Sequence, residues 1–399
     1  MIFITNIHNQ NKKNSMVNRF ILNEVSYFGP GARKELAGEV KRLGYKKALV
    51  VTDKGLMKFG VAQKVIDVLD ANNIPYAIFD DVKPNPTVTN VKNGIEACKK
   101  AEADFIVAIG GGSAMDTAKG IGIVCNNPEF SDIVSLEGVA DTKKKSLPII
   151  ALPTTAGTAA ETTINYVIID EVHQKKMVCV DPNDIPAVAI VDAELMYSLP
   201  KSLTAATGMD AMTHAIEGYI TKAAWEMSDM FEIKAIEMIY KYLPIAVSEP
   251  ENPVGRNGMA VAQYIAGMAF SNVGLGVDHG MAHPMSALHD VPHGVACAML
   301  LPVVMRFNAP VAKEKYTEIA KACGVYEDGM TTDEAVEAAC KAIEDLSKLV
   351  GIPQHLTDIG ITEGDIPALA QQAINDVCTP GNPRDVTIED IYALYRQIL

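Results

Sequence analysis

The sequence predicts an α/β domain with a parallel sheet, followed by an all-helical domain. In the first half, short apolar runs alternate with amphipathic stretches, which is typical of a parallel sheet covered by helices on both faces. After about residue 199 the sequence becomes rich in Ala, Met and Glu with helical periodicity, and no convincing strand follows. We therefore place an α/β domain at 16–195 and a helical domain at 196–399, with a ligand-binding cleft between them.

Five runs of the first domain are expected to be strands, because each is compact, largely apolar and bounded by Gly, Pro or Asp. They are residues 46–53, 76–82, 105–110, 147–153 and 187–193. Amphipathic helices are expected between them at 61–73 and 88–102. In the second domain the clearest helical segments are LTAATGMDAMTHAIEGYI, MSDMFEIKAIEMIYKYL and TTDEAVEAACKAIEDLSKLVG.

The composition is that of a soluble globular protein with a large core. The chain has 399 residues, of which 48% are hydrophobic and 21% charged, and its net charge is −14. An acidic protein repels phosphodiester backbones, so nucleic acid is not an expected partner. No apolar run reaches the ~20 residues needed to cross a bilayer, so no membrane association is expected. Seven cysteines without a C-x-x-C pair predict free thiols in a reducing compartment, and hence a cytoplasmic protein.

The first 15 residues are expected to form a poorly ordered extension. They have neither the continuous apolar region nor the small-residue cleavage site of a secretory signal. Met16 offers a second plausible start, immediately before the apolar segment that leads into the first domain.

A glycine loop follows the expected strand at 105–110. Gly110, Gly111 and Gly112 are consecutive, and Ser113 then opens a helix. Glycines let the backbone approach a ligand closely, and free N–H groups at a helix start attract phosphate oxygens. The alternative is a tight strand-to-helix turn without a ligand, since the motif differs from the G-x-G-x-x-G fingerprint.

Two other strand ends favour a dinucleotide site at the same edge of the sheet. Asp53 ends the strand at 46–53, where a carboxylate can bind the adenosine ribose and repel a 2′-phosphate; the alternative role is an N-cap of the next helix. The loop ALPTTAGTAAE at 151–161 offers small side chains and hydroxyls that suit a cofactor surface, although an ordinary turn would also explain it. Together the three loops predict binding of NAD.

The histidines predict a metal site. Only eight are present, and four of them fall between residues 279 and 293. His279 and His283 are four residues apart, as are Asp210 and His214, so each pair shares one face of its expected helix; His293 follows in a Pro–His–Gly turn. Singly, His214 is better explained as a hydrogen-bonded core residue. One carboxylate with three imidazoles, from Asp210, His214, His279 and His293, fits Fe(II) or Zn(II) and leaves an open position for a substrate.

The motifs GGGSAMD, PTTAGTAAE, GMDAMTHAIEGY and HGMAHP…PHGVA together resemble those of the iron-containing (group III) alcohol dehydrogenases. The likeness extends from Met16 to the C-terminus. Stretches such as TTAGTAAETTINYVIID and FSNVGLG are most similar to the branch of that family that acts on lactaldehyde and 1,2-propanediol. The resemblance implies a homodimeric enzyme that transfers a hydride between NAD(H) and a short-chain alcohol or aldehyde, with a metal as Lewis acid.

The resemblance also implies roles for individual residues. It makes Asp210, His214, His279 and His293 the metal ligands and gives His283 a catalytic part as a proton-relay or positioning residue. It places the cofactor against Asp53, Asn85, Gly111, Gly112, Ser113, Thr154, Thr155, Thr158 and Lys176, and the substrate against Asn165, Phe270 and Cys378. Asp278 departs from the pattern, because an apolar residue is usual beside the ligand His279; its carboxylate either supports the ligand or faces solvent.

Several alternatives stay open from the sequence. Iron and zinc both suit the ligand types, and 1,3-propanediol, ethanol, butanol or glycerol could replace 1,2-propanediol as substrate. A lyase resembling dehydroquinate synthase shares the fold and uses NAD and a metal, but it needs several basic residues for its substrate. A metal- or nucleotide-binding protein without catalysis is the third alternative.

Overall fold

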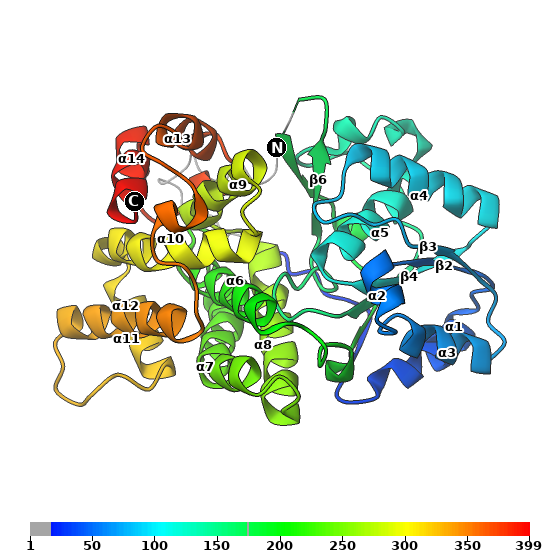
Figure 1. The fold of residues 1–399 in the computed structure, drawn as a ribbon, viewed down its shortest axis with the longest axis horizontal. Helices are drawn as coiled ribbons and strands as arrows, with labels where there is room; N and C mark the ends of the chain where they lie inside the picture. Colours follow the sequence, from blue (N-terminus) through cyan, green and yellow to red (C-terminus); the bar gives the residue numbers. More distant parts are fainter. Residues whose placement is uncertain (1–16, 174) are drawn as a thin grey trace.

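The computed structural model describes residues 17–173 and 175–399, and it shows an α/β half beside a helical half (Figure 1). The predicted extension at 1–15 lies outside the described residues. The boundary expected at residue 195 falls in the short 3-10 helix η6 (Ala193–Leu195), between the last strand and the first long helix of the helical half.

The α/β half is built on a sheet that is parallel, as predicted, and has six strands. The strand order is β1-β8-β5-β4-β2-β3, and every neighbouring pair is parallel. The strands are β1 (Val25–Phe28), β2 (Ala48–Val51), β3 (Tyr76–Phe79), β4 (Phe105–Gly110), β5 (Ile149–Pro153) and β8 (Val188–Val191). All residues of β2, β4, β5 and β8 are buried, which explains why they are continuous apolar runs in the sequence.

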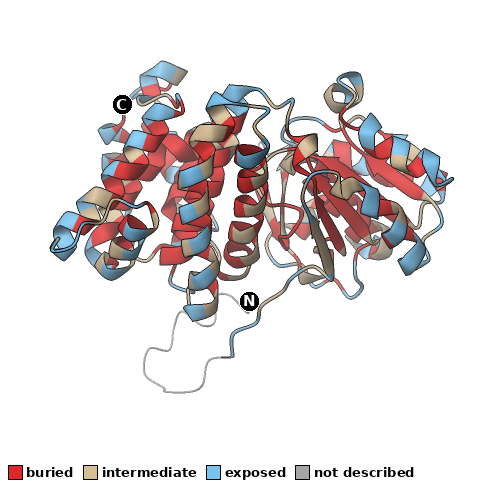
Figure 2. Ribbon diagram, turned by 90° about the horizontal axis from the view of Figure 1, so that it is seen from below, coloured by how far each residue is buried: buried red, intermediate tan, exposed pale blue. Residues whose placement is uncertain are grey.

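Helices cover both faces of this sheet. The helices are α1 (Leu36–Leu43), α2 (Lys54–Lys58), α3 (Gln63–Ala71), α4 (Val88–Ala101) and α5 (Gly112–Asn126). Alternate residues of β2 belong to different cores: Leu49 and Val51 pack on the side of α4 and α5, and Ala48 and Val50 on the side of α1 and α3. Figure 2 shows the sheet as a buried layer between helices whose outer faces are exposed.

Two features of this half were not predicted. The edge strand β1 is only four residues long and half-buried, so it has no continuous apolar run. A separate antiparallel pair, β6 (Asn165–Asp170) and β7 (Lys175–Val180), alternates buried and partly exposed residues. This alternation is the pattern of a sheet with one solvated face.

Among the described residues, the second half contains helices and no strand. The long helices are α6 (Lys201–Ile220), α7 (Glu226–Ser248), α8 (Pro253–Val273), α9 (Val277–His289), α10 (His293–Asn308), α11 (Lys313–Ala322), α12 (Thr332–Leu349), α13 (Ile366–Ile374) and α14 (Ile388–Gln397). Short 3-10 helices in the α/β half are η2 (Ala32–Glu35), η3 (Pro128–Phe130), η4 (Ile133–Leu136) and η5 (Pro182–Asp184), and those in the helical half are η7 (Ala309–Val311), η8 (Leu356–Ile359) and η9 (Thr379–Gly381).

Within residues 17–173 and 175–399, one segment, His293–Val311, is long and apolar enough to cross a membrane by length and composition alone, and α8 and α9 pass the same test only if the bent pair is counted as one span. Most of its window, 61%, is buried inside the molecule. A core helix of a globular protein has the same properties, because it is apolar on all sides.

The loop after β5 joins the carboxyl edge of the sheet to the helical half. The N–H of Ile164 donates to Ser271 Oγ of α8 at 2.9 Å. A Cβ on Gly157 would lie 2.8 Å from Thr207 of α6, so the loop and this helix are in close contact. This packing brings the loop predicted to contact a cofactor next to the helices predicted to bind a metal.

Candidate active site between the two domains

Three helices of the helical half bring the predicted metal ligands together. Helix α6 carries Asp210 and His214 one turn apart, α9 carries His279, and α10 begins at His293. Asp210 Oδ1 lies 3.8 Å from His279 Nε2, 3.6 Å from His293 Nε2 and 4.0 Å from His214 Nδ1. The rings of His214 and His279 are stacked with centroids 4.5 Å apart. The four side chains predicted as metal ligands therefore form one cluster around the Asp210 carboxylate.

The cluster has the chemistry of a metal site. Asp210 Oδ1, His214 Nδ1 and His279 Nε2 are buried and lack a hydrogen-bond partner within the described part of the chain. Leaving such atoms unpaired is unfavourable, whereas a cation bound by ligand atoms at about 2.1 Å would satisfy them. His293 keeps 24% of its side chain exposed, which leaves the cluster open on one side. The residues thus fit Fe(II) or Zn(II) with room for a substrate oxygen.

Burial sets the charge of these groups. It lowers the pKa of His214 and His293 well below the ordinary value, so both are neutral imidazoles with a lone pair for a metal. Burial also raises the pKa of Asp210 to about 6, against the opposing effect of His279 and Lys176. A bound cation would favour the ionised carboxylate.

Two carboxylates that the sequence analysis missed orient the histidines. Glu217 Oε2 lies 2.6 Å from His279 Nδ1, and Asp376 Oδ2 lies 2.7 Å from His283 Nδ1. Such partners fix the tautomer and leave Nε2 as the free nitrogen. Glu217 lies three residues after His214 on the same helix, so helical spacing could have found it; Asp376 is 93 residues from His283 and no local pattern indicates it.

Asp278 lies in the core and does not face solvent, so that alternative is wrong. Its side chain is fully buried, and neither carboxylate oxygen has a hydrogen-bond partner among the residues described. Its backbone N–H donates to Glu217 Oε1 at 2.8 Å. Burial raises the pKa of Asp278 well above the ordinary value, and Glu217 and Asp210 raise it further.

The glycine loop forms a narrow cradle at the end of β4. Helix α5 starts at Gly112, and its N-cap Gly111 provides no side-chain cap. A Cβ on Gly111 would lie 3.1 Å from Thr155, and one on Gly112 would lie 2.9 Å from Thr158. The glycine loop is therefore in close contact with the threonine loop after β5, and a side chain at either glycine would fill the space between these two loops. The backbone N–H groups at this helix start suit a pyrophosphate.

Other residues expected at the cofactor lie at the ends of β3, β4 and β5 and on the separate strand β7. The Thr154 N–H donates to Gly110 O at 2.9 Å, and Ser113 is in the first turn of α5. Asn85 is exposed in the turn after β3, with φ 54°. Lys176 lies on β7, and burial lowers the pKa of its ammonium, opposed by charges that include Asp116, Asp210 and Asp376.

Asp53 takes the N-cap role that was its alternative explanation. Its Oδ1 accepts a hydrogen bond from the Leu56 N–H at 2.8 Å and so starts α2. The second carboxylate oxygen is not used in this cap, so the cap and a contact to a ribose are compatible.

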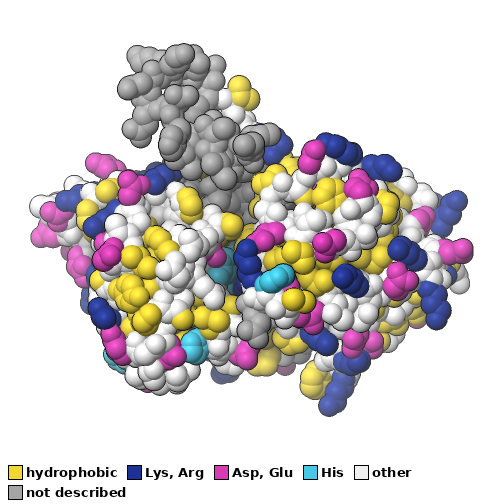
Figure 3. Space-filling model, turned by 90° about the horizontal axis from the view of Figure 1, so that it is seen from above, with side chains coloured by type: hydrophobic (Ala, Val, Ile, Leu, Met, Phe, Trp, Pro, Cys, Tyr) yellow, Lys and Arg dark blue, Asp and Glu magenta, His cyan; other side chains and the backbone are white. Residues whose placement is uncertain are grey.

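Of the three residues expected to wall a substrate pocket, Phe270 and Cys378 lie beside the histidines. The Phe270 ring stacks on His214 at 4.1 Å with an interplanar angle of 8°. Cys378 donates its N–H to Asp376 Oδ1 at 2.9 Å, next to His283. Asn165 begins β6, and its carbonyl accepts from Lys119 Nζ at 2.8 Å. Figure 3 shows histidine side chains in a hollow between the two halves.

Lys119 is a further buried residue that the sequence analysis missed. Its ammonium also donates to the carbonyl of Thr163 at 2.7 Å and to the Thr163 hydroxyl at 3.0 Å. These bonds tie α5 to the segment between the Thr-rich loop and β6. Because the side chain is fully buried, these hydrogen bonds satisfy its ammonium inside the core.

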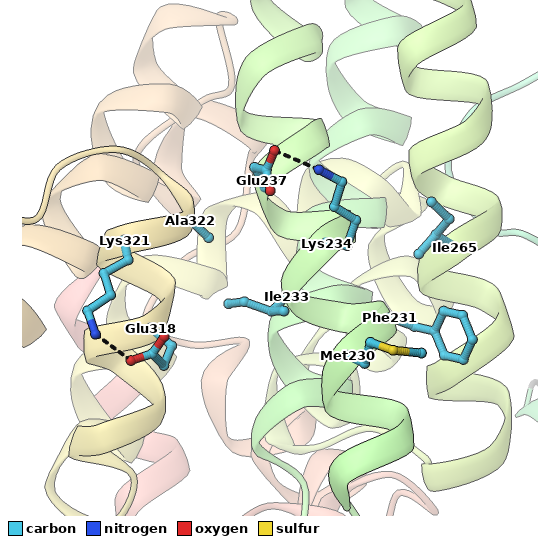
Figure 4. Close-up of a pocket in the computed structure, with 9 residues that line it drawn as sticks. All are labelled: Met230, Phe231, Ile233, Lys234, Glu237, Ile265, Glu318, Lys321 and Ala322. Carbon is cyan, nitrogen blue, oxygen red and sulfur yellow. Dashed lines mark hydrogen bonds and ion pairs between the residues drawn. The ribbon is translucent and has the colours of Figure 1, made fainter.

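A surface hollow of about 660 Å³ lies away from this site, between α7, α8 and α11 (Figure 4). Its charged lining residues pair with one another: Lys234 with Glu237 at 2.8 Å, and Lys321 with Glu318 at 2.7 Å. Its lining contains no histidine or cysteine, so it offers no comparable chemistry.

The chain is similar to known proteins over nearly its whole length. Residues 23–193 match the iron-containing alcohol dehydrogenase family, and residues 204–399 match the C-terminal part of the Fe-containing alcohol dehydrogenase family. Lactaldehyde reductase of Escherichia coli (strain K12) is 56% identical over 380 residues, which cover 95% of this chain and 99% of that protein.

Solved structures give the same result. A 1,3-propanediol oxidoreductase superposes with a TM-score of 0.94 at 42% identity, covering 96% of this chain and all of the other. Sulfoacetaldehyde reductase from Bifidobacterium kashiwanohense, solved with NAD+, has a TM-score of 0.85 at 34% identity and covers 96% of this chain and 99% of its own. With the cluster of Asp210 and its three histidines beside a glycine cradle, these likenesses show that the chain belongs to the iron-containing alcohol dehydrogenase family.

Proposed function

We propose that this enzyme interconverts lactaldehyde and 1,2-propanediol with NAD(H) in the cleft between its two domains. The observation that carries the proposal is the position of the Asp210 cluster, with its unpaired buried ligand atoms, on the helices that pack against the cofactor loop. The identity to lactaldehyde reductase supports the choice of substrate. A soluble homodimer in the cytoplasm is part of the same proposal.

In this proposal Asp210, His214, His279 and His293 hold Fe(II). The bound ion supplies a Lewis acid for the substrate oxygen, and NAD(H) supplies the hydride acceptor or donor. Phe270 and Cys378, beside the histidines, exclude water from the reacting carbon.

His283 is the residue assigned to proton movement. Its Nδ1 bonds to Asp376, so its Nε2 is free to accept the hydroxyl proton of an alcohol or return it to a product. Changing His283 to Ala should leave the metal bound and depress turnover, since its role is not to bind the ion. A variant that lost its metal stoichiometrically would contradict this division of roles.

The preference for NAD over NADP is assigned to Asp53. Its free carboxylate oxygen would bind the ribose hydroxyls and repel a 2′-phosphate. The variant Asp53→Asn keeps an oxygen for the α2 cap but removes the charge, whereas Asp53→Gly removes both. Both should relax the cofactor preference, measured as the ratio of kcat/KM with NADH and NADPH; an unchanged ratio in both would refute the role.

The deciding experiment is anaerobic NADH oxidation by metal-stripped protein supplied again with Fe(II) or Zn(II). Lactaldehyde is compared with other C2–C4 aldehydes at equal concentration. Fe(II)-dependent activity that is highest with lactaldehyde is the expected result. Higher activity with another aldehyde would overturn the substrate and keep the chemistry, and no turnover with any aldehyde and either metal would overturn the dehydrogenase.

A further inference from the structure

Two cysteines of the α/β half lie on neighbouring helices, Cys98 on α4 and Cys125 on α5. The two helices lie side by side over one face of the sheet (Figure 1). Each helix connects two strands of a parallel sheet, so both helices run opposite to the strands and parallel to each other. A contact between the helices is therefore followed, one turn later on both, by the next contact.

The packing of α4 against α5 places the two thiols at such a contact. A Cβ on Gly94 of α4 would overlap the Ile121 side chain of α5, so the helices approach closely at this glycine. Cys98 is four residues after Gly94, and Cys125 is four residues after Ile121, which is one turn further along each helix. Cys98 belongs to the apolar core on this face of the sheet, and Cys125 packs against the same core.

The two thiols differ in exposure and in acidity. Cys98 is 2% exposed, whereas Cys125 is partly exposed at the end of α5. A hydrogen bond with Cys125, together with burial, raises the pKa of the Cys98 thiol. The same hydrogen bond lowers the pKa of Cys125 against the opposing effect of burial, and the Lys99 ammonium lowers it further. Because the thiolate is the nucleophile in thiol chemistry, Cys125 is the sulfur that reacts first.

Three other cysteines provide a reference for this reactivity. Burial raises the pKa of Cys323 and of Cys340 to about 12. Burial also raises the pKa of Cys179 above its ordinary value. These thiols are therefore protonated and shielded from reagents, which are the properties of an inert structural cysteine.

We propose that Cys98 and Cys125 form a reversible redox site, which a low-molecular-weight disulfide closes to a protein disulfide that fastens α4 to α5. This inference goes beyond the alcohol chemistry and does not depend on it. In a reducing compartment such a bond is transient, as is usual for redox-sensing disulfides there.

The reaction is two successive exchanges. The Cys125 sulfur attacks one sulfur of the small disulfide, whose S–S bond breaks, so that a mixed disulfide forms on Cys125 and one small thiol leaves. The Cys98 sulfur then attacks the Cys125 sulfur, forms the protein disulfide and releases the second small thiol. Two electrons and two protons pass from the protein to the small disulfide, which becomes two thiols.

The new bond would close a loop from Cys98 to Cys125. This loop contains β4 and the glycine cradle at the start of α5. A cross-link restricts the unfolded chain more than the folded one, so the closed form of the site should be the more stable form of the protein.

The test uses 2-hydroxyethyl disulfide as the probe, because it is small and uncharged and so is not repelled by a protein of net charge −14. The full-length protein is incubated with it anaerobically, digested without reduction and analysed by mass spectrometry. We expect the peptides that contain Cys98 and Cys125 to be joined by a disulfide, and dithiothreitol to separate them again.

The order of attack predicts a different product in each of two variants. Cys98→Ser should stop at a mixed disulfide on Cys125, because no second sulfur displaces the small thiol. Cys125→Ser should leave Cys98 unmodified, because that thiol is buried. Cys323→Ala is the matched control: it removes a buried cysteine of the helical half and should form the same disulfide as the wild type.

Thermal unfolding measures the fastening of the two helices. The Tm of the closed form should be several degrees above that of the reduced form, and dithiothreitol should reverse the difference. An equal or lower Tm of the closed form would contradict the fastening.

Three results of the mass analysis would overturn the redox site. The first is a folded wild type that keeps both thiols free or stops at the mixed disulfide on Cys125. The second is a disulfide that joins either cysteine to a different one. The third is modification of Cys98 in Cys125→Ser at the rate seen for Cys125 in Cys98→Ser, which would remove the assigned order of attack.

Discussion

At the scale of single residues, the most informative side chains are those that hold the histidines in place. Glu217 and Asp376 each accept a hydrogen bond from the Nδ1 of a histidine, at 2.6 and 2.7 Å. Neither carboxylate is a hydrogen-bond partner of the ligand atoms that lack one among the described residues. Each carboxylate binds Nδ1 of its histidine and so leaves Nε2 available to a metal or a substrate. Their substitution should change function without removing any presumed ligand.

Asp376→Asn is expected to lower kcat by about 10- to 100-fold, because the amide no longer enforces the His283 tautomer with Nδ1 protonated. The metal content and the KM for NADH should stay at the wild-type values. Steady-state kinetics and metal analysis on the same preparation measure all three. Asp376→Glu is the matched control and should recover part of the turnover; a kcat equal to that of the wild type in Asp376→Asn would contradict the role.

The buried carboxyl group of Glu232 is expected to make the free energy of unfolding depend on pH. Its side chain is fully buried in α7, and neither carboxylate oxygen is hydrogen-bonded among the described residues. Burial raises its pKa well above the ordinary 4.5, so the folded state keeps a proton that the unfolded state loses. The free energy of unfolding therefore falls as the pH rises above 4.5 toward the folded pKa, by up to about 1.4 kcal/mol per pH unit.

Glu232→Gln removes this titration, so its stability relative to the wild type should increase from pH 5 to pH 8. Urea denaturation at several pH values measures the difference. Glu226→Gln, at an exposed position of the same helix, is the control and should show no such trend. A difference in the free energy of unfolding between Glu232→Gln and the wild type that stayed constant from pH 5 to pH 8 would contradict the prediction.

The sequence predicts much of the site at this scale, because Asp210, His214, His279 and His283 follow the four-residue spacing of a helix. Asp376 could not be found in this way, since it reaches the site only through the packing of a loop near α13.

At the scale of elements, the site depends on two loops that are pressed together. The glycine loop between β4 and α5 contacts the threonines that follow β5, and the latter segment also contacts α6 and α8. A change in the distance between these two loops should therefore affect the affinity for the cofactor more than the affinity for the metal.

Gly112→Ala should weaken NADH binding by about tenfold, because the new Cβ would lie 2.9 Å from Thr158 and relieving such a contact costs about 1–3 kcal/mol. Fluorescence titration with NADH measures the change. Gly38→Ala is the matched control: this exposed glycine of α1 has nothing within 4 Å of a new Cβ, so binding should be unchanged. Equal affinities in the two variants would rule out the tight contact.

The predictability of each element follows from its burial. The five strands at 46–53, 76–82, 105–110, 147–153 and 187–193 were found because most are buried on both faces and therefore continuously apolar. The edge strand β1 and the hairpin of β6 and β7 were missed, since a half-buried strand carries fewer apolar residues. The turn before His293 was recognisable from Pro292 and Gly294, which flank the start of α10.

At the scale of the whole molecule, ligands from α6, α9 and α10 meet at one point, so a bound metal would cross-link three helices of one core. Removing it should lower the free energy of unfolding by RT ln(1 + [M]/Kd), about 2.7 kcal/mol at a free metal concentration 100 times Kd.

Thermal unfolding with and without a chelator measures this effect, and the Tm should fall by several degrees on chelation. The variant His214→Ala serves as the control, because the chelator should shift its Tm less than that of the wild type. An unchanged Tm in a wild-type sample shown to have lost its metal would contradict the cross-link.

The sheet topology also has a consequence for the newly made chain. The first strand, β1, pairs with the last, β8, in the register Val25↔Val188, so the edge of the sheet cannot be completed until nearly half of the protein has left the ribosome. At about 5–20 residues per second, this takes on the order of 10–40 s of synthesis. During that interval β5 and β1 lack β8, the strand that lies between them, and their backbone N–H and C=O groups are unpaired. A chaperone that covered these open strand edges would be most useful to the nascent enzyme in this period.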